Sequence, residues 1–157
     1  VGVDGPGGGK FINALELSDA IEAFWPNEEP NKYVVFTGGE PGLQLDKNVV
    51  DHLHLKNFEV AVETNGTLDL PLNIDWLTVS PKADSTLKIR RGNELKLVYP
   101  QENVFPNSFE DLDFEIFYLQ PMDNEDKDKN TQRTIQYCLE NPKWKLSLQT
   151  HKYMGIA

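Results

Sequence analysis

Two consecutive glycines and a glutamate, Gly38, Gly39 and Glu40, follow a short apolar run and could bind an amino acid. Paired glycines let a ligand approach bare backbone, and they present amide donors to a carboxylate. A glutamate beside them can accept hydrogen bonds from an ammonium group. Together the three residues suit an amino-acid zwitterion, although a Gly-Gly-Glu-Pro sequence taken alone is more typical of a tight turn.

Four further polar turns follow other short apolar runs. They cover residues 63–67, 80–82, 120–123 and 149–152. Ser80 and Lys82 could hold hydroxyl groups or a carboxylate, and Asn65, Gln120 and Gln149 carry paired donors and acceptors that suit the edge of a heterocycle. Ligands of parallel sheets bind outside the carboxyl ends of the strands. We therefore expect the five turns to line a single cleft.

The apolar periodicity that must position these turns predicts six strands and three helices. Strands are expected over residues 32–37, 58–64, 75–80, 94–99, 114–119 and 145–150, and helices over 17–25, 46–55 and 130–140. This alternation is typical of an α/β fold with a mostly parallel sheet. A closed eight-stranded barrel needs about 250 residues. Residues 1–157 are therefore expected to form one domain, a partial TIM-like barrel with uneven helical cover.

The same patterns predict helix starts and core positions. Ser18 or Asp19 is expected to cap the first helix and Thr131 the third, because these residue types cap helices. The inward side chains are expected to be Leu17, Ala20, Ile21, Phe24, Val49, Val50, Leu53, Leu55, Ile135, Cys138 and Leu139. The first strand is a nearly continuous apolar run, which favours burial on both faces. The charged stretch 123–130 is interpreted as a surface loop.

Composition excludes several classes of partner. A formal net charge of −10 argues against a nucleic-acid surface, which relies on clustered Lys and Arg. The tightest basic cluster, Lys88, Arg90 and Arg91, is interpreted as a solvated loop face. No stretch approaches the ~18 apolar residues that span a bilayer, and residues 1–10 show no signal-peptide pattern. The single cysteine permits no internal disulfide. These features favour a small-molecule partner and the cytoplasm.

Other residues with chemical potential carry weaker signals. Residues 4–9 are rich in glycine, but no strand precedes them and no Gly-Lys-Ser/Thr follows, so a phosphate site is not predicted. His52 and His54 are two positions apart, which separates them on a helix and disfavours a metal pair. Cys138 is expected to be a core residue of its helix. His151, in the turn expected after the last strand, is open to a functional or a structural role.

At residues 34–41 the sequence resembles the radical S-adenosylmethionine superfamily, whose Gly-Gly-Glu-Pro motif stands at the end of a strand. Four further blocks narrow the resemblance to the 7-carboxy-7-deazaguanine synthase family. They are residues 63–67, 78–82, 119–123 and 148–157, and they occur in the family's order. The first block is common to many relatives, whereas the last is far more specific.

The resemblance implies a radical ring contraction of 6-carboxy-5,6,7,8-tetrahydropterin to 7-carboxy-7-deazaguanine, on the route to queuosine. It implies S-adenosylmethionine, a four-iron four-sulfur cluster and Mg²⁺ as cofactors, and a homodimer as the assembly. The residues implied for S-adenosylmethionine are Gly38, Gly39, Glu40, Gly66, Ser80, Pro81, Lys82, Gln120, Pro121, Met122 and Asp123. Those implied for the pterin are Thr64, His151 and Ala157, the last through its free carboxylate.

The family holds its cluster through a CxxxCxxC motif after its first strand, and its Mg²⁺ through a Thr just beyond that motif. These 157 residues contain one cysteine, Cys138, which stands in a different context. The resemblance therefore implies that the amino-terminal strand and the cluster loop lie outside them. The chain by itself is expected to bind no cluster and to be inactive. Two alternatives stay open, a non-catalytic module with an S-adenosylmethionine or pterin pocket and an unrelated α/β protein.

Overall fold

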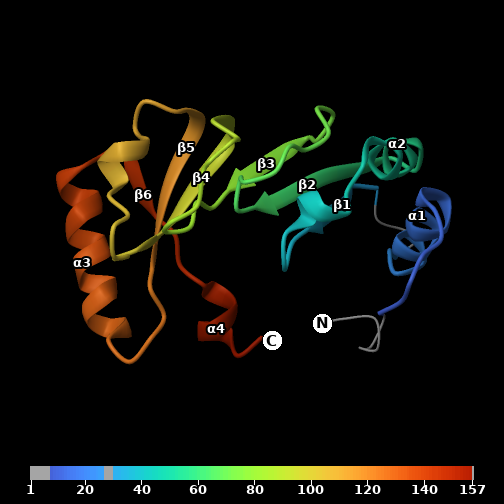
Figure 1. The fold of residues 1–157 in the computed structure, drawn as a ribbon. Helices are drawn as coiled ribbons and strands as arrows, with labels where there is room; N and C mark the ends of the chain where they lie inside the picture. Colours follow the sequence, from blue (N-terminus) through green and yellow to red (C-terminus); the bar gives the residue numbers. More distant parts are fainter. Residues whose placement is uncertain (1–7, 27–29, 157) are drawn as a thin grey trace.

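Six parallel strands form one open sheet, in which each strand lies beside the next strand along the chain (Figure 1). The computed structural model describes residues 8–26 and 30–156. The strands are β1 (Lys32–Phe36), β2 (Phe58–Thr64), β3 (Trp76–Val79), β4 (Arg91–Tyr99), β5 (Asp113–Pro121) and β6 (Trp144–Leu146). The helices are α1 (Ala14–Ala23), α2 (Lys47–Leu55), α3 (Lys127–Glu140) and α4 (Thr150–Met154). The predicted α/β fold with an incomplete barrel is confirmed, because all five strand pairs are parallel and β1 does not meet β6.

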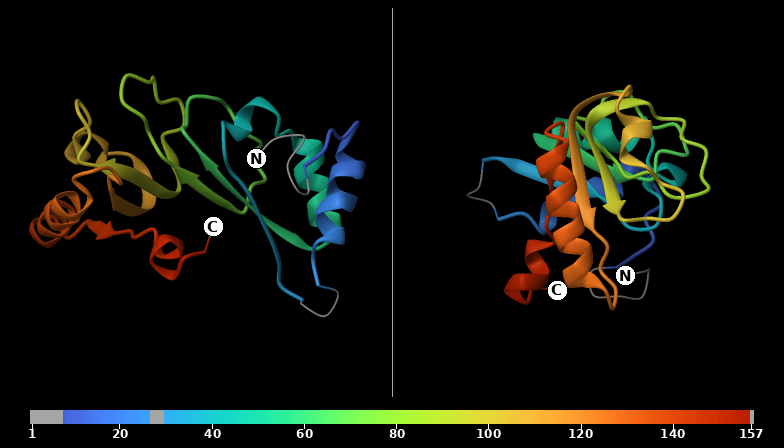
Figure 2. Two further views of the ribbon diagram at one scale, coloured as in Figure 1. Left: turned by 90° about the horizontal axis from the view of Figure 1, so that it is seen from below. Right: turned by 90° about the vertical axis from the view of Figure 1, so that its left-hand side faces the viewer.

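Helices cover the two ends of one face of the sheet (Figures 1 and 2). α1 and α2 pack with β1 and β2 around a core in which Val50 and Val60 are fully buried. α3 packs on β5 and β6 at the other end, against a core that contains Leu119 and Trp144. Cys138 of α3 is half-buried against this second core, which confirms its predicted place. In the part of the chain that the structure describes, no helix could cross a membrane.

The first helix begins earlier than predicted. Asn13 is its cap, and the Asn13 Oδ1 accepts a hydrogen bond from the Glu16 N–H at 2.9 Å. The predictions of Ser18 or Asp19 as the cap are therefore wrong, and Ser18 is buried inside the helix. Phe24, predicted to face the core, is 75% exposed. It is the C-cap of α1, one residue beyond the end of the helix.

The second helix follows its prediction except at its last residue. Asp46 caps α2 by accepting a hydrogen bond from the Val49 N–H at 3.0 Å. Val49, Val50 and Leu53 are buried as predicted. Leu55, however, is 81% exposed, so its predicted inward position is wrong. Two residues along a helix turn by roughly 200°, which places Leu55 on the face opposite Leu53.

The third helix begins at Lys127, so the charged stretch 123–130 is a loop only in its first half. Thr131 is not the cap, and its hydroxyl donates to the carbonyl of Lys127 inside the helix. The core-facing side includes the buried polar residues Asn130 and Thr134. The Thr134 hydroxyl donates to the Asn130 carbonyl at 2.7 Å, which satisfies it without solvent. Leu139, predicted to face inward, is 72% exposed because it lies off this face.

Two strands also differ from their predictions. β1 is not buried on both faces, since Tyr33 and Val35 are 41% and 44% exposed. It is an edge strand, and only its alternate side chains pack beneath the helices. β6 ends at Leu146, where a strand to residue 150 was predicted, and α4 follows instead.

The face of the sheet without helices is polar. Side chains alternate along a strand, so burial of Leu95 and Leu97 in the core on one face directs Lys96 to the opposite face. The strand register places Glu63 beside Thr78, and Thr78 beside Glu94, on this same face. Polar side chains therefore line the inner face of the partial barrel and lead to the carboxyl ends of its strands.

An ion-pair group ties α1 to the sheet and makes folding sensitive to acid. The Glu22 carboxylate lies 2.6 Å from the Nζ of Lys32 and 2.6 Å from the Nζ of Lys56. Hydrogen bonds from Lys32 and then Lys56 lower the pKa of Glu22 to about 2, from an ordinary 4.5. Because the folded pKa is depressed, this stabilisation is present above the ordinary value and is lost as pH falls toward the folded value.

We expect the unfolding midpoint in urea to fall more steeply for the unchanged protein than for Glu22→Gln as pH drops from neutral to about 3. The control is Glu59→Gln, which removes an exposed carboxylate with no ion pair among the described residues. Glu59→Gln should keep the steep profile. Parallel profiles for the unchanged protein and Glu22→Gln would contradict the assignment.

Candidate functional site

The polar turns at the carboxyl ends of the strands converge on one cavity of about 310 Å³. Residues of β2, β4 and β5 form its wall together with residues that follow β1, β3 and β6. The lining residues are Thr37, Gly38, Gly39, Glu63, Thr64, Asn65, Ser80, Lys82, Lys96, Val98, Gln120 and Gln149. The parallel sheet places all these strand ends at one edge, as the sequence predicted. The individual binding roles of the residues stay predictions.

The glycine pair lies between this cavity and a second one. Gly38 and Gly39 have φ values of +75° and +53°, and a β-carbon built on either residue meets nothing within 4 Å. The second cavity, about 340 Å³, has an apolar wall formed by residues such as Leu17, Phe36 and Val49. Bare backbone is thus open to a ligand at this turn. An amino-acid carboxylate can reach the amides here, and an apolar group can enter the neighbouring cavity.

Glu40 fastens the glycine turn to the end of β2. One carboxylate oxygen accepts hydrogen bonds from the Thr64 hydroxyl at 2.7 Å and the Gly42 N–H at 3.0 Å. The other accepts from the Asn65 N–H at 2.8 Å. Burial raises the pKa of Glu40, but these three hydrogen bonds outweigh it, and the pKa is lowered overall. Most of the acceptor capacity is therefore used within the protein, and contact with a ligand ammonium group stays a prediction.

The turn after β2 is built from closely spaced polar groups. Thr64 is buried, and its hydroxyl accepts from the Gly66 N–H at 3.0 Å while it donates to Glu40. Gly66 has a φ of +77°, and a β-carbon there would lie 2.6 Å from Leu87 and 2.7 Å from Val79. Thr64 lines the cavity, whereas Gly66 supports it from behind. Of the two predicted residues, Thr64 therefore contacts the cavity directly, and Gly66 lies behind its wall.

The turn after β3 presents one cation to the cavity. The Ser80 N–H donates to the Thr64 carbonyl at 2.8 Å, and Pro81 is buried behind it. Lys82 is exposed, and the contacts of the described residues include no ion pair for its ammonium group. It is available to an anionic part of a ligand.

The turn after β5 is tied to α4. The Asp123 carboxylate pairs with Lys152 of α4 and lies 3.7 Å from the Nζ of Lys127. Lys152 and then the nearby Lys127 lower the pKa of Asp123. The Nζ of Lys127 also lies 4.9 Å from the centre of the Tyr153 ring, a cation–π contact. These contacts hold the short helix beside the site, although Pro121, Met122 and Asp123 do not line the cavity of about 310 Å³.

Two of the three residues predicted to bind the substrate, His151 and Ala157, are not among the described residues that line this cavity. His151 was expected in a strand-end turn, and that expectation is wrong because the residue is exposed within α4. It does not line the cavity, and Gln149 is the lining residue that precedes α4. Ala157 lies outside the described residues.

Sequence reasoning missed the polar lining residue Lys96, and it placed Thr37 and Glu63 in the site turns without giving either a role. The Nζ of Lys96 lies 3.1 Å from a carboxylate oxygen of Glu63, and the pair spans β2 and β4 across β3. The available signal was the alternation of polar and apolar side chains near the ends of these strands. It could direct the two side chains to one face, but it could not pair residues 33 positions apart.

The described residues do not fit an iron–sulfur cluster or a metal ion. No group of three or more His, Cys, Asp or Glu residues in the described ranges could hold a metal. Burial raises the pKa of the Cys138 thiol, which disfavours the thiolate that ligates a metal. His54 is engaged with Asp75 at 2.8 Å, and His52 with the Asn48 carbonyl at 2.8 Å.

The chain is similar to several curated proteins named 7-carboxy-7-deazaguanine synthase. It is 54% identical to those of Caulobacter vibrioides and Bordetella pertussis over 156 residues, which cover 99% of this chain and 74% of each relative. The relative from Nitratidesulfovibrio vulgaris is 50% identical over 162 residues, with 99% and 75% covered. No family model matches the chain.

A solved structure titled crystal structure of QueE from Escherichia coli shares the fold. Its TM-score is 0.64 at 24% identity, and the match covers 87% of this chain and 64% of that one. The fold likeness agrees with the relatives, and the expected family is confirmed. With half of its residues identical across nearly its whole length, this chain belongs to the 7-carboxy-7-deazaguanine synthase family.

Proposed function

We propose that the protein acts as a 7-carboxy-7-deazaguanine synthase, a radical S-adenosylmethionine lyase in queuosine biosynthesis. The observation that carries the proposal is the 54% identity with proteins of that name over 99% of the chain. The cavity at the carboxyl ends of all six strands supports it, because ligands of such sheets bind there. The proposed substrate is 6-carboxy-5,6,7,8-tetrahydropterin, and the reaction contracts its ring.

The residues around Gly38 and Gly39 fit S-adenosylmethionine. An open backbone turn suits the carboxylate of its methionyl end, and Lys82 suits an anionic group nearby. Bound to a reduced four-iron four-sulfur cluster, this cofactor supplies the radical chemistry of the superfamily. Glu40 would hold the turn in place, and Gln120 and Gln149 would hydrogen-bond heterocycle edges across the cavity.

The cluster needs cysteine ligands that these 157 residues do not supply, since the sequence holds one cysteine. We therefore expect the chain by itself to yield no 7-carboxy-7-deazaguanine and to retain no iron after anaerobic reconstitution. Mass spectrometry of the product and iron analysis are the measurements. Product formed by the 157 residues alone would overturn this expectation.

The transcript upstream of the Val1 codon tests the enzyme assignment directly. An in-frame CxxxCxxC followed by a Thr is expected, and the protein with that segment should then contract the pterin ring anaerobically. An initiation codon near Val1 without such cysteines would refute the enzyme assignment for this gene product. The second candidate, a non-catalytic binding module, would then be favoured by the retained cavity and tested by equilibrium dialysis with S-adenosylmethionine.

The proposal also includes the partner, the cellular compartment and the assembly of the protein. A net charge of −10 and a small polar cavity favour a small-molecule partner over nucleic acid. We place the protein in the cytoplasm and propose that it forms a homodimer. Sedimentation velocity tests whether the protein forms a homodimer.

A further inference from the structure

The turn after β2 contains the one Asn-Gly pair of the sequence, Asn65 and Gly66. Such a pair can lose ammonia without an enzyme, because glycine has no side chain to hinder attack by its backbone nitrogen. Asn65 is half-buried and lines the cavity of about 310 Å³, whereas Gly66 is buried behind its wall. A covalent change at Asn65 would therefore alter the candidate site directly.

The reaction joins two groups of the same turn. The Gly66 backbone nitrogen gives up its proton to solvent and attacks Cγ of Asn65, so that an N–Cγ bond forms. The Cγ–Nδ2 bond then breaks, and Nδ2 takes up a proton and leaves as ammonia. Water opens the resulting succinimide at either carbonyl, which leaves aspartate or isoaspartate at position 65. The only co-reactant is water, which reaches the half-buried Asn65.

The Asn65 side chain is already held against the backbone of its own turn. Its Oδ1 accepts a hydrogen bond from the Thr67 N–H at 2.8 Å. A donor on this oxygen stabilises the negative charge that develops there when a nucleophile adds to Cγ. The electrophile is thus prepared for attack, and the rate depends on the state of the Gly66 nitrogen.

The Gly66 N–H is engaged by a buried acceptor. It donates to the Thr64 hydroxyl at 3.0 Å, and that hydroxyl donates to the Glu40 carboxylate at 2.7 Å. Hydrogen bonds in a chain polarise one another, so donation to a carboxylate makes the hydroxyl oxygen a stronger acceptor. A hydrogen bond to the protonated nitrogen disfavours loss of its proton, and so does the nearby negative charge of Glu40. The chain of hydrogen bonds therefore keeps the nitrogen unreactive.

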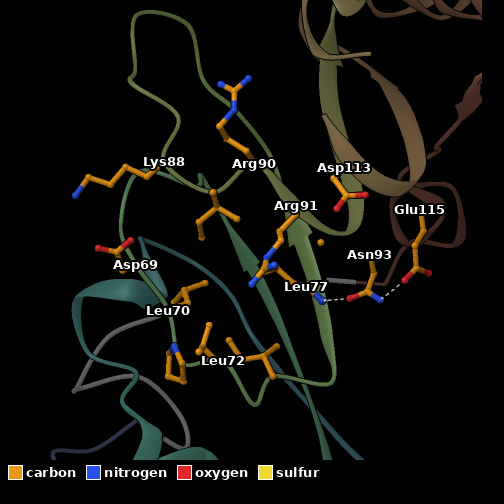
Figure 3. A pocket seen from close by; sticks show the side chains of 14 residues that line it. Asp69, Leu70, Leu72, Leu77, Lys88, Arg90, Arg91, Asn93, Asp113 and Glu115 are labelled. Carbon is orange, nitrogen blue, oxygen red and sulfur yellow. Dashed lines mark hydrogen bonds between the residues drawn. The ribbon is translucent and has the colours of Figure 1, made fainter. Parts of the chain in front are cut away.

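A second loop fixes Gly66 from the other side. The Gly66 carbonyl accepts hydrogen bonds from the amides of Lys88 and Ile89 at 2.9 and 3.1 Å. Figure 3 shows this loop at Lys88 and the loop that carries Asp69, and both residues line a cavity of about 570 Å³. Ring closure changes the backbone angles on both sides of the Gly66 nitrogen, so it disturbs these two hydrogen bonds. The contact between the loops therefore also opposes the reaction.

We propose that Asn65 is a site of deamidation. Hydrogen bonds that run from Gly66 through Thr64 to Glu40 hold the reaction back while the protein is folded, and their loss speeds it. The product carries a new carboxylate beside Glu63 in the cavity wall, which disfavours an anionic ligand there. The inference is independent of the proposed catalytic function, because the reaction needs only this turn and water.

Mass spectrometry of the tryptic peptide that covers residues 57–82 measures the modification, because deamidation raises its mass and fragment ions locate the changed residue. Thr64→Val removes the hydroxyl with little change of shape. It is expected to deamidate at position 65 about tenfold faster than the unchanged folded protein, since one hydrogen bond to the nitrogen is lost. The matched control is Thr64→Ser, which keeps a hydroxyl and should react at the unchanged rate. A zero-time sample corrects for reaction during digestion.

The same peptide supplies internal references. Asn57 and Asn73 precede residues other than glycine, and their rates should change little in either variant. Equal acceleration at all three asparagines would show a general loosening of the fold and would overturn the proposal. In urea, the unchanged protein and both variants should react at position 65 at one common, faster rate. Differences that persist in urea would assign the effect to local sequence, which also overturns the proposal.

Glu40→Gln keeps the inference testable if circular dichroism shows that Thr64→Val does not fold. The glutamine retains an acceptor for the Thr64 hydroxyl but removes the negative charge. Deamidation at position 65 should therefore be severalfold faster than in the unchanged protein. An unchanged rate in a folded Thr64→Val protein, or in Glu40→Gln where Thr64→Val is unfolded, would refute the protective role of the hydrogen bonds.

Discussion

Gly66→Ala is expected to lower the free energy of unfolding by about 2–4 kcal/mol, through a left-handed backbone and an overfilled core. The φ of Gly66 is +77°, which side chains disfavour. A β-carbon would also lie 2.6 Å from Leu87 and 2.7 Å from Val79, and Val79 is fully buried. The Gly66 carbonyl accepts hydrogen bonds from the amides of Lys88 and Ile89, so a shift here moves a second loop.

The control for this prediction is Gly38→Ala, measured in the same urea unfolding series. Gly38 has nearly the same φ, +75°, but nothing lies within 4 Å of its β-carbon. Gly38→Ala should therefore lower the free energy of unfolding only through the strained left-handed backbone, by about 1–2 kcal/mol. Equal losses at the two positions would show that packing against Val79 and Leu87 contributes nothing. If Gly38 binds S-adenosylmethionine, Gly38→Ala should weaken that affinity more than its small loss of stability explains.

Glu40→Ala is expected to destabilise the site by about 2–4 kcal/mol, because three hydrogen-bond donors lose their acceptor. The Thr64 hydroxyl is buried, so it cannot turn to water in exchange. The amides of Gly42 and Asn65 lose partners at 3.0 and 2.8 Å. The affinity for S-adenosylmethionine should fall at least tenfold, since the glycine turn is no longer held against β2.

Glu40→Gln separates the acceptor role from the charge. A glutamine retains one carbonyl oxygen, so it should keep part of the stability and lose the pH dependence of this site. The pKa of Glu40 is lowered in the folded state, so its contribution is present above the ordinary value of 4.5 and is lost as pH falls. Urea unfolding at several pH values measures both effects. A Glu40→Ala protein of unchanged stability would contradict the anchoring role.

The variants at Gly38, Gly66 and Glu40 test different roles for residues around the glycine turn. Gly38 and Gly39 leave backbone open to a ligand, whereas Glu40 ties their turn to the end of β2 and Gly66 lies tightly against Leu87 and Val79. The conformation of the Gly-Gly-Glu-Pro turn therefore depends on contacts made 24 and 25 positions away. Reading Glu40 from its neighbours alone suggested a partner for an ammonium group, because the competing donors of β2 could not be seen in the local pattern.

Local patterns sufficed for much of the scaffold. The apolar run at residues 58–64 predicted β2 to the residue, and Val49, Val50 and Leu53 were identified as core positions. The order of the polar turns predicted one lined edge, because parallel strands all end on the same side. Such inferences depend on residues within a few positions of each other, whose directions follow from the helical or strand period. They weaken at element ends, as Phe24, Leu55 and Leu139 show.

The sequence by itself thus determined the family, the parallel α/β architecture and the strand-end residues that gather at the site. Tertiary structure alone decided that Lys96 meets Glu63, that residues 150–154 form a helix fastened by Asp123, and that β1 keeps one face exposed. It also decided that the Thr64 hydroxyl lies between the Gly66 amide and the Glu40 carboxylate. Each of these outcomes depends on which distant segment arrives, or fails to arrive, at a given surface. The free energy of such a contact depends on both segments together, so the sequence pattern of either segment alone does not predict it.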